Sequence, residues 1–370
     1  MRKGCARTLC CNLLQLLLAS AAGASGGPAL QTGDRFVASL KAYGGRIASD
    51  FKRLHVEGWR GQFPGAWPYN LSDGSPIYTE SREYCAVLYL SGGAAGGDSP
   101  SLVVEQGTLL GHSSRCLSAG LTVARRTRPS SRLQYHAFDF FRSFPAASKI
   151  AALGATSGSL LLKARRTLKK NQEYSEAVWH KLMVDPVFDG AVAHPGNITK
   201  TTPKILASAK STGLFPKLHE RLRRQTLASP DTPVEIWSID SAKSHRAFIE
   251  QARAVWPRLR VGSVIHLMDC FKIQLLFFFD TFVASGDVEV VYAAPGGAPW
   301  SFVVRRAPLD WSKVTSYGAA TCARKPALAK LLHGTVDHLA RVYNTGPAYA
   351  KRLHSRLVAD KHCPHVKSSE

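Results

Sequence analysis

Apolar runs rich in β-forming residues alternate with helical patterns from residue 102 onward, and this alternation constrains the fold more than any other feature of the sequence. Most of the runs lack strict polar alternation, so we expect strands that are buried on both faces, each followed by a helix. Such a pattern predicts a mostly parallel α/β sheet with helices on both faces. The expected strands are residues 102–105, 133–139, 190–197, 234–240, 263–269, 288–293 and 302–305.

Helical spacing is found at residues 113–123, 244–256 and 271–284, between the expected strands. The last two strands lie too close together for a crossover helix, so one of them should run antiparallel at the edge of the sheet. Residues 326–358 have helical spacing of leucine and valine and should pack as C-terminal helices. The predicted fold class is therefore α/β, with a doubly wound, mostly parallel sheet of seven strands.

Acidic residues stand at the ends of several of these strands. Glu105, Asp139, Asp240 and Asp269 each come at or next to the C-terminal end of an expected strand. Because parallel strands end at the same edge of a sheet, the four carboxylates should point to one crevice. Open α/β sheets bind their ligands in this crevice.

A glycine-bearing turn joins the first strand to its helix. Gly107 permits a tight turn and a close approach of the backbone to a ligand, and Gly111 precedes the free N–H groups of a helix N-terminus. Ser113 or Ser114 should cap that helix. A dinucleotide site would have a tighter Gly-x-Gly-x-x-Gly pattern, which is absent, and Glu105 suits a cationic or hydroxyl-rich ligand better than a pyrophosphate.

These segments resemble a known family. Residues 102–121 are similar to motif I of class I S-adenosylmethionine-dependent methyltransferases, and residues 239–245 and 256–269 are similar to later motifs of its sugar and secondary-metabolite O-methyltransferase branch, which includes macrocin O-methyltransferase. The resemblance implies a Rossmann-like fold and S-adenosylmethionine as the cofactor. The chain departs from that branch where Ser263 replaces a glycine and Met268 replaces an aspartate. The second departure puts the divalent metal site of the branch in doubt, and we assign no metal ligand.

Site roles follow from these positions. Glu105 and the glycine turn should hold the methionine and ribose portion of the cofactor, and Asp139 should accept hydrogen bonds from the ribose hydroxyls. Residues 190–197 resemble the segment that lies near the adenine in methyltransferases, which implies that Asn197 borders the adenine. The predicted cofactor-binding residues are Glu105, Gly107, Gly111, Ser113, Asp139, Asn197 and Asp240.

The catalytic residues should face the transferred methyl group. Methyl transfer needs an aligned oxygen nucleophile and removal of its proton. His245 is the candidate general base because the ordinary pKa of histidine lies near neutrality, and Asp240 or Asp269 could serve instead.

The predicted reaction is O-methylation of a sugar or other small-molecule hydroxyl. The formal net charge of +22 favours an anionic acceptor, such as an acidic glycan. Nucleic acid is disfavoured because the basic residues are dispersed and lack interleaved aromatic side chains. The sequence does not determine the acceptor or the oligomeric state.

The N-terminus has the pattern of a signal peptide. Arg2, Lys3 and Arg7 precede an apolar run at residues 13–22, and small residues follow. Because this run is short of the roughly 20 residues that cross a bilayer, a cleaved signal at residues 1–24 is favoured over a signal anchor. We therefore expect the endoplasmic reticulum or Golgi lumen, or secretion, with no transmembrane span after cleavage.

The remaining chain divides into three parts on composition. Residues 25–97 should form an N-terminal extension that packs on the main domain, and residues 92–100 should be a flexible connector. The cofactor-binding domain should span residues 98–306, with an insertion at about 145–185, because the stretch between its second and fourth strands is too long for two helices and one strand. A helical segment, residues 307–370, should complete the chain.

Cysteines and sequons are consistent with a secretory route. Asn70 and Asn197 lie in Asn-x-Ser/Thr triplets, and we expect Asn70 to be the better glycosylation site because Asn197 should lie in the cofactor crevice. At most two disulfides can form from the cysteines beyond the signal, none of which has zinc-ligand spacing: Cys85, Cys116, Cys270, Cys322 and Cys363.

Three alternatives stay open. A secretory glycosyltransferase commonly has a metal-binding Asp-x-Asp, which is absent here. A non-catalytic protein that keeps the fold would bind the cofactor without methyl transfer. A polyanion-binding module rests only on the net charge, and a steep salt dependence of heparin retention would support it.

Overall fold

The computed structural model describes residues 29–44, 82–108, 111–141, 176, 179–180, 188, 190–207, 231–242, 245–268, 277–293, 300–315 and 325–343. The predicted signal peptide, Asn70 and Asp269 lie outside these residues, as does most of the predicted insertion.

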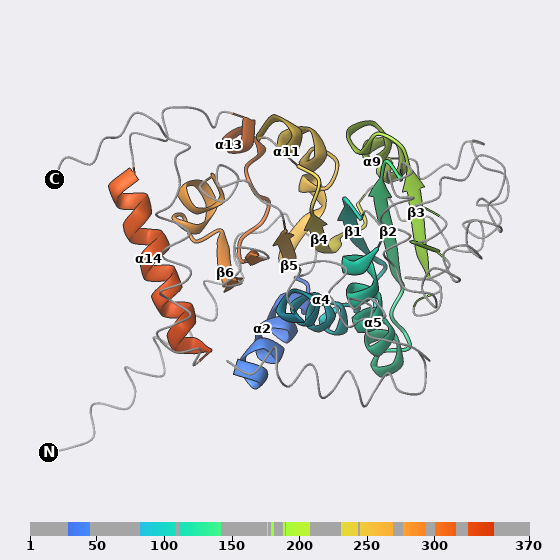
Figure 1. Ribbon diagram of the computed structural model, residues 1–370, viewed down its shortest axis with the longest axis horizontal. Helices are drawn as coiled ribbons and strands as arrows, with labels where there is room; N and C mark the ends of the chain where they lie inside the picture. Colours follow the sequence, from blue (N-terminus) through green and yellow to red (C-terminus); the bar gives the residue numbers. More distant parts are fainter. Residues whose placement is uncertain are drawn as a thin grey trace, which may run out of the picture.

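A single sheet forms the centre of the molecule (Figure 1). Its seven strands have the order β3-β2-β1-β4-β5-β7-β6, and β3, β2, β1, β4 and β5 are parallel to one another. The predicted Rossmann-like, mostly parallel sheet is confirmed. The strands are β1 Ser101–Gln106, β2 Leu133–Asp139, β3 Ala191–Pro195, β4 Val234–Ile239, β5 Leu259–Leu267, β6 Val288–Ala293 and β7 Trp300–Val304.

The antiparallel strand is β7, which pairs with β5 on one side and β6 on the other. It therefore lies one position inside the edge, and β6 forms the edge itself. After β6 the chain turns back and forms β7 between β6 and β5. A short connection between β6 and β7 is therefore sufficient.

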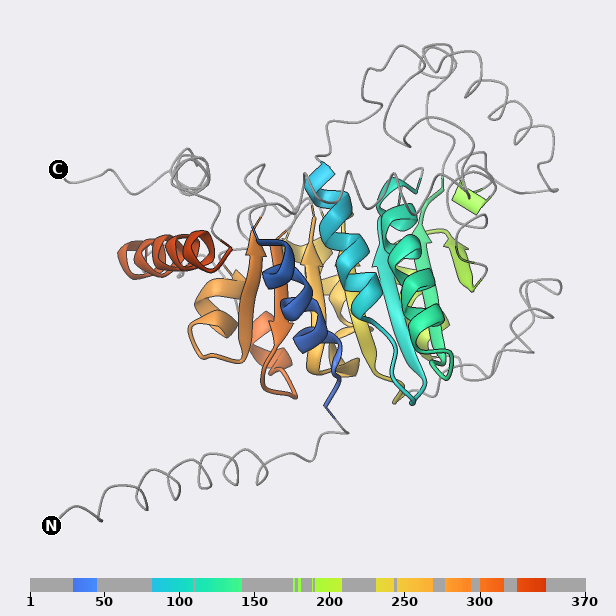
Figure 2. The same ribbon diagram turned by 90° about the horizontal axis from the view of Figure 1, so that it is seen from below.

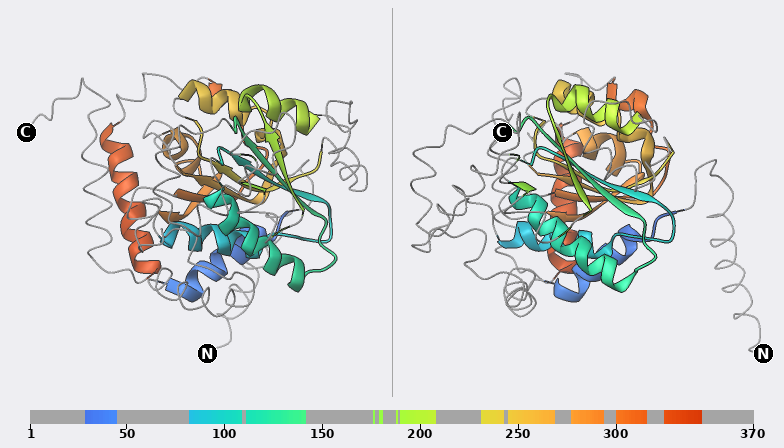
Figure 3. Two further views of the ribbon diagram at one scale, coloured as in Figure 1. Left: turned by 45° about the vertical axis from the view of Figure 1, so that its right-hand side comes forward. Right: turned by 90° about the vertical axis from the view of Figure 1, so that its right-hand side faces the viewer.

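Helices cover both faces of the sheet (Figures 1 and 3). In Figure 1 the layer below the sheet contains α2 Thr32–Tyr43, α4 Arg82–Ala94 and α5 His112–Thr127. The layer above it contains α9 Ile198–Ala207, α11 His245–Ala252 and α13 Trp311–Thr315. Two short segments precede strands in the sequence: the 3-10 turn η3 Trp256–Arg258 comes before β5, and the π-helical segment η4 Phe279–Val283 comes before β6. None of the helices that the structure describes is long and apolar enough to cross a membrane.

The two helices that the structure describes before β1, α2 and α4, belong to a layer of this fold. Figure 2 shows α2 and α4 lying across the sheet beside α5. Phe36 and Leu40 of α2 are fully buried, and the Phe36 ring meets the His266 ring of β5 edge-on at 5.7 Å. The extension therefore contributes to the same hydrophobic core as the sheet.

The predicted flexible connector at residues 92–100 is wrong at its beginning. Gly92 and Gly93 belong to α4, and a Cβ on Gly92 would lie 2.5 Å from the backbone oxygen of Leu117 in α5. In the same way, a Cβ on Gly120 of α5 would lie 2.1 Å from the backbone oxygen of Tyr89 in α4. These glycines allow two helix backbones to approach, and a Cys85–Cys116 disulfide joins the same two helices.

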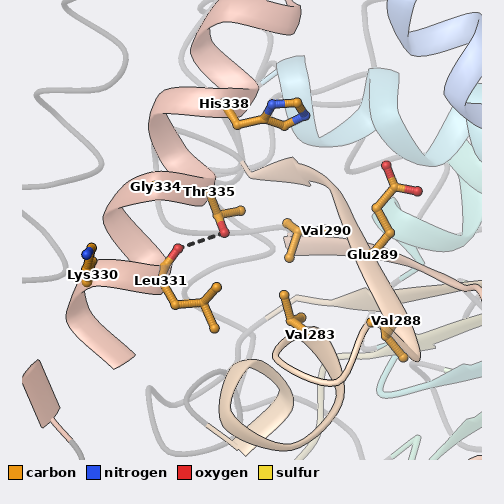
Figure 4. Close-up of a pocket in the computed structure, with 10 residues that line it drawn as sticks. Val283, Val288, Glu289, Val290, Lys330, Leu331, Gly334, Thr335 and His338 are labelled. Atoms are coloured by element: carbon orange, nitrogen blue, oxygen red, sulfur yellow. Dashed lines mark hydrogen bonds between the residues drawn. The ribbon is translucent and has the colours of Figure 1, made fainter. Parts of the chain in front are cut away.

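Helix α14 Lys325–Val342 confirms the first part of the predicted C-terminal helical segment and lies beside the edge strand β6 (Figure 1). The Tyr343 hydroxyl donates to the backbone oxygen of Val291, a position where the β6 register shifts. A groove of about 650 Å³ separates α14 from β6 and η4. Figure 4 shows its apolar walls, which include Val283, Val290 and Leu331.

Candidate functional site

The strands β1, β2, β3 and β4 end together at one edge of the sheet. Backbone hydrogen bonds connect the ends: Gly107 donates to Phe138 at 2.8 Å, and Asp240 donates to Gln106 at 2.8 Å. Gly196, directly after β3, donates to Asp139 at 2.9 Å. The structure thus confirms that the strands carrying Glu105, Asp139 and Asp240 end at one edge, and a common crevice for the three carboxylates stays a prediction.

The turn after β1 has the geometry that its glycines predict. Gly107 has a φ of +89°, and a Cβ there would lie 2.8 Å from the carbonyl carbon of Asp240 and 2.8 Å from the Ser241 Cβ. Gly111 has a φ of +94° and is the N-terminal cap residue of α5. Both positions favour glycine because L side chains rarely adopt this conformation. The backbone of β1 therefore passes directly against the end of β4.

Asp139 fixes this turn from the neighbouring strand. Its Oδ2 accepts a hydrogen bond from the Thr108 backbone nitrogen at 2.6 Å, and its Oδ1 accepts from the Phe141 nitrogen at 3.1 Å. Phe141 itself has a φ of +49°, which is uncommon for a residue with a side chain. These two hydrogen bonds hold the Asp139 side chain against the glycine turn.

Glu105 supports the turn from inside the core. It is 1% exposed and accepts hydrogen bonds from Ser114 Oγ at 2.5 Å and from the Tyr135 hydroxyl. Trp179 Nε1 donates to the same Ser114 oxygen at 2.8 Å. Burial raises the pKa of the Glu105 carboxyl, although hydrogen bonds from Ser113, Ser114 and Tyr135 oppose the shift. The described contacts give Glu105 a structural role, and its predicted contact with a cofactor stays a prediction.

The predicted serine cap of α5 is wrong. The helix begins at His112, so Ser113 and Ser114 lie in its first turn, and the cap residue Gly111 has no side chain to offer. Ser114 donates to Glu105 instead. Gly111 holds the cap position because the chain enters the helix through the left-handed conformation.

A buried amide at this edge, Gln106, was not among the residues predicted from the sequence. Gln106 is fully buried, and its Oε1 accepts from Trp237 Nε1 at 2.9 Å. Its Nε2 donates to Thr202 Oγ1 at 3.2 Å and to the Gln251 backbone oxygen at 3.1 Å. A polar residue inside an apolar strand run was the available signal, because a buried amide requires partners.

The same network holds the end of β4. Ser241 Oγ donates to Gln251 Oε1 at 2.7 Å and lies 3.1 Å from the Gln106 backbone oxygen. Gln106 and Gln251 therefore fix the segment that contains Asp240 against the glycine turn, and they connect it to α9 and α11.

The remaining predicted residues occupy the borders of this edge. His245 is the first residue of α11, and its side chain, like all of Asp269, lies outside what the structure describes. Asn197 is exposed and caps α9: its Oδ1 accepts from the Thr199 nitrogen at 3.0 Å and from Thr199 Oγ1 at 2.7 Å. The catalytic role of His245 and the adenine contact of Asn197 stay predictions.

A buried histidine pair lies behind the edge, between β2 and β3. His136 Nδ1 and His194 Nε2 are 2.9 Å apart, and the rings are stacked with centroids at 5.1 Å. Burial, together with the nearby Arg258, lowers the pKa of His136 to about 4, and burial and the neighbouring histidines lower that of His194. Because the pKa of each ring is lowered, both rings are neutral near pH 7, and one nitrogen of the bonded pair donates while the other accepts.

The described residues contain no ready metal site. Among them, no group of three or more His, Cys, Asp or Glu side chains is arranged to hold a metal ion. Asp269 lies outside that set, so the expectation for the metal stays a prediction.

No protein-family model matches the chain, and no curated protein matches its sequence significantly. The O-methyltransferase NovP is similar in structure, with a TM-score of 0.38 and 12% identity over 70% of this chain and 100% of that one. TomG from Streptomyces achromogenes, an O-methyltransferase involved in tomaymycin synthesis and solved in complex with SAM, has a TM-score of 0.33 and 15% identity over 70% and 90%.

The calicheamicin methyltransferase CalS11 is a further similar structure, with a TM-score of 0.32 and 16% identity over 56% of this chain and 73% of that one. All three similar proteins are methyltransferases by name. The fold assignment of this chain rests on its own strand order and strand directions.

Proposed function

We propose that this protein is an S-adenosylmethionine-dependent methyltransferase that methylates a hydroxyl of a sugar or other small molecule in the secretory pathway. One observation carries the proposal: the glycine turn lies where the strand order reverses. From β1 the chain builds outward to β2 and β3 on one side and to β4 and β5 on the other. Ligands of doubly wound sheets bind outside the carboxyl ends of the strands at this switch point.

The residues present fit such a cofactor. Thr108 Oγ1, in the turn, is buried and has no hydrogen-bond partner among the residues that the structure describes. The N-terminus of α5 comes after this turn, and its free N–H groups could bind the carboxylate of the methionine portion of S-adenosylmethionine. Gly107, Gly111 and Asp139 would hold the cofactor, which supplies an electrophilic methyl group when bound.

The protein's own task is alignment and proton removal. The acceptor oxygen must approach the methyl carbon in line, and this edge of the sheet is held in place by the Gln106–Gln251–Ser241 network. His245, Asp240 or Asp269 would remove the hydroxyl proton as the oxygen–carbon bond forms and the bond from the methyl carbon to the cofactor sulfur breaks, which would leave S-adenosylhomocysteine.

A secretory location is supported by two independent features. The N-terminal sequence has the pattern of a signal peptide. Cys85 and Cys116 form a disulfide, which is typical of oxidising compartments.

The net charge of +22 favours an anionic acceptor.

Calorimetric titration with S-adenosylmethionine tests the cofactor site. Gly107→Ala places a methyl group against the Asp240 backbone in a positive-φ conformation, so it should weaken binding at least about tenfold, or ~1.4 kcal/mol. Gly97→Ala is the matched control, because a Cβ there meets nothing within 4 Å. Absence of binding by the folded wild-type protein would refute the methyltransferase proposal, and nucleotide-sugar donors would be titrated next.

A further inference from the structure

The sequon at Asn197 lies on the surface, at the exit of β3. Asn197 is exposed, whereas the middle residue of the triplet, Ile198, is 3% exposed and anchors the start of α9 in the core. The amide of Asn197 is therefore presented to solvent from a fixed turn. Such a turn, in which an asparagine side chain bonds the backbone two residues on, is locally stable.

Of the two polar atoms of the Asn197 amide, only the oxygen takes part in capping α9. Asn197 Oδ1 accepts both hydrogen bonds from Thr199, and Nδ2 makes none to any residue that the structure describes. A substituent on Nδ2 would leave the carbonyl oxygen in place, so the cap of α9 would persist.

We propose that Asn197 is an N-glycosylation site, so that a glycan stands at the carboxyl edge of β3, next to the candidate site. A new bond forms between Nδ2 and the anomeric carbon of a lipid diphosphate-linked oligosaccharide, the bond from that carbon to the phosphate oxygen breaks, and Nδ2 loses one proton. The proposal rests on the secretory part of the proposed function. It also assigns Asn197 to the surface in place of the predicted adenine contact.

Two substitutions separate glycosylation from helix capping. Asn197→Asp removes the acceptor nitrogen but keeps an oxygen that can accept from Thr199, and aspartate is a favoured cap residue. Thr199→Ser keeps both the triplet and the hydroxyl donor. Both variants should fold like the wild type, and only Asn197→Asp should lose the glycan.

The full chain with its own leader would be translated in the presence of microsomes, and protease-protected chains would be treated with an amide-cleaving glycosidase. In an Asn70→Asp background, one glycan should remain, Thr199→Ser should retain it, and Asn197→Asp should abolish it. Mass spectrometry of the peptide that contains Asn197 gives the site directly.

The failures are distinguishable. A protected chain without a glycan on Asn197 overturns this proposal alone. A chain that stays outside the microsomes overturns the secretory assignment and this proposal together. Binding of S-adenosylmethionine is measured separately, so the enzymatic proposal can stand or fall independently.

Discussion

The two halves of the sheet are packed differently. In the half formed by β3, β2, β1 and β4, which we call the parallel half although β5 also runs parallel to these strands, polar groups are buried among the apolar ones: Glu105, Gln106 and the His136–His194 pair all lie within or between these strands. Each has hydrogen-bond partners on neighbouring elements. These networks place particular backbone segments at the edge where the strands end.

The half formed by β5, β7 and β6 is filled largely by aromatic rings. Trp256 is surrounded by Phe278, Phe282 and Trp311 at centroid distances of 6.1, 5.2 and 5.8 Å. Phe278 in turn lies 5.0 Å from Phe302 of β7. This half is stabilised mainly by buried apolar area, which has little directional preference.

The difference indicates a division of tasks. Buried hydrogen-bond networks specify one arrangement of groups, whereas aromatic packing supplies stability. The candidate site accordingly belongs to the parallel half. The following changes test that division, from the largest expected effect to the smallest.

Trp256→Ala should lower the free energy of unfolding by about 3–5 kcal/mol, because it empties the centre of the aromatic cluster. It also removes the donor to the Leu309 oxygen at 3.0 Å. Chemical denaturation measures the loss, and Trp311→Ala, at the half-buried margin of the same cluster, should cost less. Cofactor affinity of the folded variant should be unchanged. A large fall in affinity would break the comparison.

Reducing the Cys85–Cys116 disulfide should cost roughly 3.7 kcal/mol, since it closes a loop between residues 31 positions apart. The bond joins α4 to α5, next to the glycine turn, so reduction should affect the parallel half. Denaturation with and without reductant gives the difference. Cys85→Ala combined with Cys116→Ala should be insensitive to reductant, and sensitivity in that variant would point to another disulfide.

Acid should destabilise the parallel half through its histidine pair. His136 has an ordinary pKa of 6.5 when unfolded and a pKa of about 4 when folded, so its contribution is complete above pH 6.5 and is lost as the pH falls towards 4. His136→Gln keeps a hydrogen-bonding side chain that does not titrate. Between about pH 7 and about pH 5, the variant should lose about 2 kcal/mol less stability than the wild type. Equal losses would show that His136 does not contribute.

Asp139→Asn should weaken S-adenosylmethionine binding about tenfold, or ~1.4 kcal/mol, because one acceptor of the turn and its charge are removed. Isothermal titration measures this, with Asp98→Asn as an exposed control near the opposite ends of the strands. If the two variants bind equally well, Asp139 has only a structural role.

Glu105→Gln should reduce the dependence of the free energy of unfolding on pH. Burial raises the pKa of this carboxyl, so its contribution is complete below the ordinary value of 4.5 and declines as the pH rises through the folded pKa. The glutamine side chain resembles the protonated acid and does not titrate. The free energy of unfolding of the variant should therefore rise relative to that of the wild type as the pH rises from about 4 to about 8. Parallel denaturation curves at both pH values would contradict the raised pKa.

The sequence was sufficient to predict the strands and the glycine turn. Buried strands differ sharply in composition from the helices around them, and Gly107 and Gly111 occupy positions where a side chain is disfavoured. The predicted ranges for β2 and β6 match the structure residue for residue. Local periodicity and local backbone conformation determine such features.

Only the tertiary structure decided the rest. A glycine-rich stretch such as the one that contains Gly92 can be a flexible loop or part of a closely packed helix, and the sequence does not distinguish the two. The close contact of α5 with α4 shows that Gly92 belongs to a packed helix. Gln106 reads as one polar residue in an apolar strand until Trp237, Thr202 and Gln251 surround it. These partners are distant in sequence, and the hydrogen bonds exist only after burial has excluded water. For that reason the sequence determined where the candidate site would form, and the packing of the helices on the sheet determined what holds it there.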